Sequence, residues 1–72
     1  MHNQYSYKEK ERLLEAAKAR LLEAADIAEK KAARATEPSV KDTMLALADL
    51  YRDMARQLDE LESLRRNLHL HQ

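Results

Sequence analysis

The chain has 72 residues, enough for one small domain, and thirteen basic and thirteen acidic side chains give it a formal net charge of zero. This balance removes the general electrostatic attraction by which strongly basic proteins bind nucleic acids or anionic membranes. Cysteine is absent, which excludes disulfide bonds and thiol chemistry.

No stretch of the sequence is apolar enough for a membrane segment or an export signal. The longest uninterrupted apolar run, at 44–48, has five residues, whereas a membrane-spanning helix needs about 20. The first five residues lack the basic segment and apolar core of a secretory signal. We therefore expect a cytoplasmic protein with no membrane partner.

The first predicted helix covers about residues 6–36. Ser6 and Glu9 have the spacing of a capping box, which marks a helix start. Apolar residues then recur at the heptad intervals of a coiled coil, which places them on one side of the helix. These residues are Tyr7, Leu14, Ala17, Leu21, Ala24, Ala28 and Ala35.

A turn at about 36–38 and a second helix at about 38–69 follow. Pro38, the only proline in a chain without glycine, disfavours helical geometry at the residue before it and suits the first turn of a helix. The second helix carries its own heptad series, broken only at Arg65. Its members are Met44, Leu47, Tyr51, Met54, Leu58, Leu61 and Leu68.

A linker this short predicts an all-α antiparallel two-helix hairpin. With the turn centred near Glu37, facing residues have numbers that sum to about 75. This pairing sets small residues of the first helix against large residues of the second, which favours close packing. The predicted hairpin core consists of Leu14, Leu21, Ala24, Ala28, Leu47, Tyr51, Met54, Leu58 and Leu61.

Further apolar residues flank this core and predict self-association. A two-helix hairpin buries only its facing stripe, and small domains without disulfides or metals commonly need a partner. A second copy would complete a four-helix bundle, and a helix of another protein is the alternative partner. The predicted interface of this homodimer consists of Leu13, Ile27, Ala48, Leu50, Ala55 and Leu64.

No catalytic, metal or cofactor site is predicted. Carboxylate metal sites in helical bundles use Glu-x-x-His pairs, and no histidine here lies three residues after a glutamate. No serine or threonine has a histidine base at a suitable position, so we do not expect an enzyme. A solvated face is the better interpretation of the first helix's acidic residues Glu15, Glu23, Asp26 and Glu29.

The expected function is therefore that of a non-enzymatic protein-interaction or scaffold module, acting as a homo-oligomeric helical bundle. The alternative is a small regulatory bundle that binds nucleic acid through Lys30, Lys31 and Arg34. The same cations also suit the negative end of the helix dipole, so their position does not by itself require phosphate. The low aromatic content offers no platform for stacked bases.

Residues 35–51 resemble a pattern found in many short, uncharacterised bacterial proteins. These proteins have an acidic residue and proline at a turn, followed by a helix reading leucine-x-leucine-alanine-x-x-tyrosine. Glu37 stands here where aspartate is usual. The resemblance implies a bacterial helical hairpin and carries no functional residues. The matching positions are Leu45, Leu47, Ala48, Tyr51 and Ala55.

Overall fold

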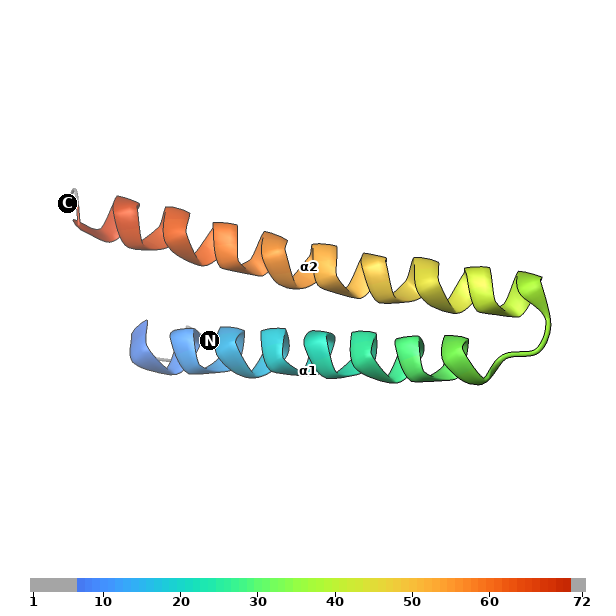
Figure 1. Cartoon of the computed structure of the whole chain (residues 1–72). Coiled ribbons are helices and arrows are strands. Elements are labelled where there is room, and N and C mark those ends of the chain that lie inside the picture. The colour runs from blue at the N-terminus through green and yellow to red at the C-terminus, as the bar shows by residue number, and fades with distance from the viewer. Residues whose placement is uncertain (1–6, 71–72) are drawn as a thin grey trace, which may run out of the picture.

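The computed structural model describes the backbone of residues 7–70 and the side chains of residues 8–68. Two helices, α1 (Tyr7–Arg34) and α2 (Pro38–Leu70), run antiparallel and side by side, joined by three residues (Figure 1). The hairpin is elongated, with Cα extents of 53 × 23 × 18 Å. The predicted all-α antiparallel hairpin is thereby confirmed, and no strand occurs within residues 7–70.

The turn forms where the proline predicts it. α1 ends at Arg34, two residues before the predicted end, and the Ala35 amide donates to the Ala32 carbonyl at 3.2 Å to close the last turn. α2 begins at Pro38, and the Lys41 amide donates to the Glu37 carbonyl at 3.0 Å as the first bond of the new helix. The predicted start at residue 6, and the side chain of Tyr7, lie outside the described residues.

The contact between the two helices is built mainly from alanine. Small side chains let the helix axes approach closely, but each buries little apolar area. Leu47 and Tyr51 pack against this contact and are only half-buried, and no large side chain among the described residues is fully buried. The apolar residues with an exposure of 5% or less are Ala25, Ala28, Ala32, Ala48 and Ala55.

The observed core differs from the predicted core at five positions, two of which are Ala25 and Ala32, buried here although neither was predicted for the core. Leu61, predicted for the hairpin core, is 49% exposed and lies outside it. Ala48 and Ala55, predicted for the oligomer interface, are 1% and 5% exposed and lie between the two helices of one chain, so they are unavailable to a second copy. The other eight predicted core residues are half-buried or buried: Leu14, Leu21, Ala24, Ala28, Leu47, Tyr51, Met54 and Leu58.

A rotation of both helices about their axes accounts for these differences. The predicted seam avoids charged residues, whereas the observed contact includes Lys18 and Glu62, which pair with each other at 3.1 Å. Between the helices, the observed contact has alanines at positions where the predicted seam has leucines. Seven of the covered positions of α2 follow the alternating spacing of four and three residues typical of a coiled coil. They are Met44, Ala48, Tyr51, Ala55, Leu58, Glu62 and Arg65.

Candidate interaction surface

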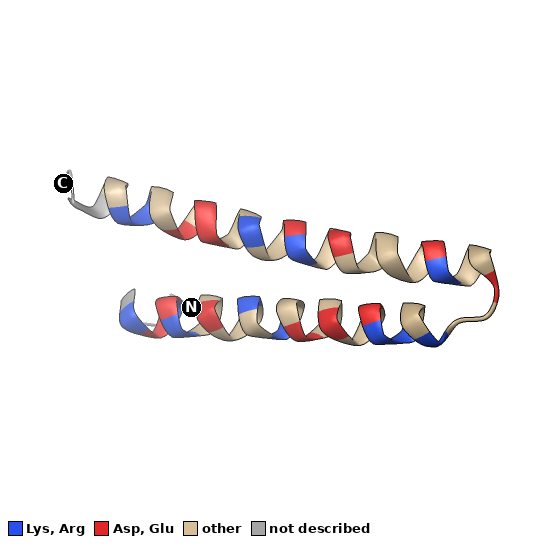
Figure 2. Cartoon of the chain, viewed as in Figure 1, with Lys and Arg blue, Asp and Glu red and all other residues tan. Residues whose placement is uncertain are grey.

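The rotation gives the hairpin two unlike long faces. At about 100° per residue, each helix turns a different set of side chains to either side of the contact line. We call one side the charged face, formed by Glu11, Glu15, Asp26, Glu29, Arg52, Asp59 and Arg66. We call the other the apolar face, formed by Leu14, Ala17, Leu21, Ala24, Leu47, Met54, Leu58 and Leu61. Basic and acidic residues are interspersed along both helices of the described chain (Figure 2).

Lys18 forms the central ion pairs of the charged face. Its ammonium donates to the carboxylates of Glu15 at 2.7 Å and Glu62 at 3.1 Å, and also to Asp59. Glu62 is the one buried charged residue among residues 8–68 and also accepts from Arg66 at 3.3 Å. The hydrogen bonds to Asp59 and then Glu15 raise the pKa of Lys18 above its usual value, so its ammonium stays charged at neutral pH.

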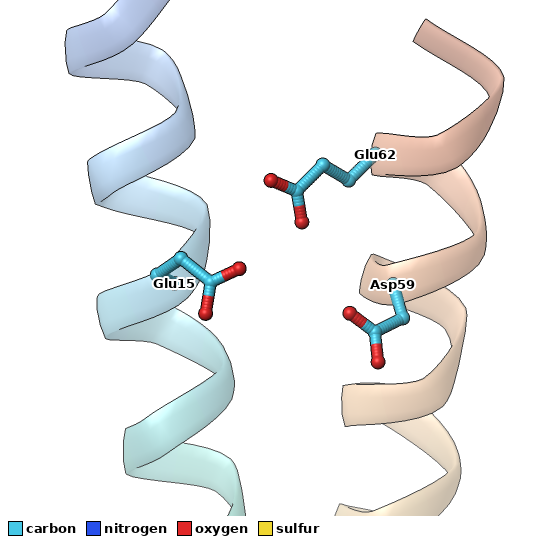
Figure 3. A group of neighbouring side chains, drawn as sticks. All are labelled: Glu15, Asp59 and Glu62. Atoms are coloured by element: carbon cyan, nitrogen blue, oxygen red, sulfur yellow. The ribbon is translucent and has the colours of Figure 1, made fainter. Parts of the chain in front are cut away.

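The three carboxylates around Lys18 come from both helices and point toward one another (Figure 3). Glu15, Asp59 and Glu62 each offer an oxygen atom within 4.8 Å of the others. Oxygen clusters of this kind suit hard cations such as Ca²⁺ or Mg²⁺. Here the positive charge comes from the Lys18 ammonium, so the arrangement is that of an interhelical salt-bridge cluster.

The sequence interpretation missed most of this cluster. Of the four acidic residues singled out on the first helix, the structure brings only Glu15 into it, whereas Asp59 and Glu62 come from α2. A signal was present, because Lys18 and Glu62 have opposite charges on the heptad lines that the observed contact follows. Counting apolar residues on each helix separately does not detect such a pair.

Arg52 and Arg66 add further ion pairs between the helices. The Arg52 guanidinium lies 2.9 Å from Glu29 and 3.7 Å from Asp26, and Arg66 lies 3.3 Å from Glu11. The hydrogen bond from Arg52 lowers the pKa of Glu29 below its ordinary value. The charged face therefore satisfies its own charges within one chain.

The lowered pKa of Glu29 predicts a loss of stability in acid. Its pairing stabilises the folded state above the pKa of the unfolded chain and is lost as the pH falls through the folded-state pKa. We expect the melting temperature to fall between about pH 5 and pH 3. Glu29→Gln should make this fall shallower, and Glu23→Gln, at an exposed position outside the ion pairs described above, should not. Superimposable curves for Glu29→Gln and the wild type would contradict the prediction.

The apolar face, in contrast, is left uncovered. An open groove on it is lined by Leu21, Met54, Gln57, Leu58 and Leu61. Of the predicted interface residues, Leu13, Ile27, Leu50 and Leu64 border this face and are exposed. Leu22 and Leu45 are exposed as well, but they lie toward the charged face.

Comparisons of this chain with protein families, curated proteins and solved structures find no match. Within residues 7–70, neither helix combines the length and apolar character needed to cross a membrane. The extended hairpin with many exposed leucines is consistent with an interaction surface.

Proposed function

We propose that this chain is a non-enzymatic protein-interaction or scaffold module that acts as a homo-oligomeric helical bundle. The observation that carries the proposal is the distribution of side-chain size: the buried apolar residues are alanines, while the leucines are half-buried or exposed. Two hairpins packed through their apolar faces would form a four-helix bundle with a core of ordinary leucine and methionine.

The free energy available from self-association supports this proposal. Burying apolar surface contributes roughly 25 cal/mol per Å², so a contact made mainly of alanines stabilises one hairpin only modestly. Association would also cover leucines that are about half exposed in the single chain, among them Leu50, Leu61 and Leu64.

Sedimentation velocity tests the proposal. The wild-type chain should sediment with twice its mass of 8.4 kDa at micromolar concentration. Leu50→Glu should sediment as a monomer with a lower melting temperature, because the dimer would bury a carboxylate without a partner. Leu45→Glu, which alters another exposed leucine on the other side of the hairpin, should leave the dimer intact.

Two outcomes would overturn the proposal. A wild-type chain that is a fully folded, stable monomer at micromolar concentration would contradict self-association. A salt-sensitive mobility shift with RNA or DNA, abolished by Lys30→Glu with Lys31→Glu, would favour the nucleic-acid-binding alternative instead. Both lysines and Arg34 are exposed near the turn end of α1.

A further inference from the structure

α2 carries a second line of mostly apolar residues, which borders the contact with α1 and turns away from it. Its members alternate in spacing by three and four residues, the pattern of a helix that packs against another helix. None of its nine members is charged. We call this line the outer seam of α2: Val40, Thr43, Leu47, Leu50, Met54, Gln57, Leu61, Leu64 and Leu68.

The outer seam is the most exposed apolar feature of the hairpin. It lies about a quarter turn around α2 from the contact with α1, so a helix docked there would not collide with α1. Leu47 and Met54 are half-buried at its inner edge. The exposed large side chains along it are Val40, Leu50, Leu61, Leu64 and Leu68, with exposures between 41% and 59%.

α1 also has a line of residues beside the apolar face, but this line is partly basic. It includes Leu13 and Ile27 but also four basic residues and no acidic one. If two copies met through this line, basic side chains would approach basic side chains, which is unfavourable. If it met the outer seam of a second copy, cations would be pressed against leucines. The four basic residues are Lys10, Arg20, Lys31 and Arg34.

We propose that the occupant of the outer seam is the α2 helix of a second copy of this chain, docked antiparallel. The inference rests on the proposed function and specifies which helix makes the interface. Met54 is the midpoint of the seam, so an antiparallel copy sets Leu47 against Leu61 and Val40 against Leu68. The five members spaced by seven residues thus meet one another across a two-fold axis, and the other four members lie between them.

The antiparallel direction follows from charge as well as from this symmetry. It opposes the dipoles of the two α2 helices. It also places the two turns at opposite ends, which separates the basic clusters of Lys30, Lys31 and Arg34 of the two copies. Gln57, the one amide on the seam, lines the groove beside Met54. A polar residue in such a seam helps to fix the alignment of two helices at some cost in stability.

Disulfide cross-linking of the full chain tests the arrangement, since the natural sequence contains no cysteine. After mild oxidation, Met54→Cys should shift from the 8.4 kDa band to twice that mass on a non-reducing gel, because the two copies of residue 54 meet at the symmetry axis. Leu47→Cys and Leu61→Cys, each oxidised alone, should run at the mass of one chain on this gel. When the two variants are mixed before oxidation, they should form the cross-linked dimer. Ala24→Cys, half-buried on α1 beside the same face, is the matched control and should not cross-link.

Other cross-linking results would each contradict a different part of the proposal. Cross-linking of Leu47→Cys alone, as strongly as Met54→Cys, would indicate a parallel dimer. Cross-linking of Ala24→Cys in place of Met54→Cys would move the interface to α1. In both cases sedimentation would still show a dimer, so the proposed function would stand while the α2 seam would not. A monomer by sedimentation for the wild type and for every variant would overturn both.

Discussion

Replacing Ala25 by leucine should lower the free energy of unfolding by about 1–3 kcal/mol, because the larger side chain overfills the closest contact between the helices. Ala25 is fully buried in the structure. Ala19→Leu makes the same change at an exposed position of the same helix and should alter stability by no more than about 0.5 kcal/mol. Ala24, half-buried toward the apolar face, should tolerate leucine better than Ala25 does.

Denaturant titrations measure these differences. If the variants unfold with the same dependence on denaturant concentration, the shift of the transition midpoint gives the change in the free energy of unfolding. Equal midpoints for Ala25→Leu and Ala19→Leu would mean that Ala25 is not at the contact between helices. A larger loss for Ala24→Leu than for Ala25→Leu would restore the seam predicted from the heptad count and refute the observed rotation of the helices.

Lys18→Met and Glu62→Met should differ strongly in their effects, although each removes one member of the same ion pair. Without Lys18, the buried Glu62 retains only Arg66 at 3.3 Å, and the melting temperature should fall by several degrees. Without Glu62, Lys18 keeps Glu15 and Asp59 on the exposed side of the cluster, and the fall should be small.

The double variant Lys18→Met with Glu62→Met completes this test. Replacing both members of a buried ion pair by apolar side chains is often neutral or stabilising, so the double variant should recover most of the loss caused by Lys18→Met. Thermal melts of the four proteins form a double-mutant cycle. Additive losses from the two single variants would show that Lys18 and Glu62 do not interact.

The sequence predicts the hairpin well because its strongest signals are local. Pro38 fixes the start of α2, and the heptad spacing of leucines and alanines on both sides of it requires two helices. The rotation of each helix about its own axis cannot be predicted from its local sequence alone. The rotation depends on which residues meet across the contact, such as Lys18 and Glu62.

The same reasoning explains which parts of the candidate surface were predicted. Leu13, Ile27, Leu50 and Leu64 lie outside the contact between helices, so moderate rotation leaves them exposed. Ala48 and Ala55 border the predicted seam, and the rotation was enough to bury them. An alanine on a heptad boundary fits either environment, because its small side chain adds little free energy in either.

The position of the turn also sets the order in which the hairpin closes. Bringing two residues together costs more entropy as the chain between them lengthens, by about 0.6 kcal/mol for each doubling. The alanine contact around Ala28 and Ala48 spans a short segment beside the turn, whereas Lys18 and Glu62 are 44 residues apart. We therefore expect the helices to join first beside the turn, through small apolar side chains, and the charged cluster to form after them.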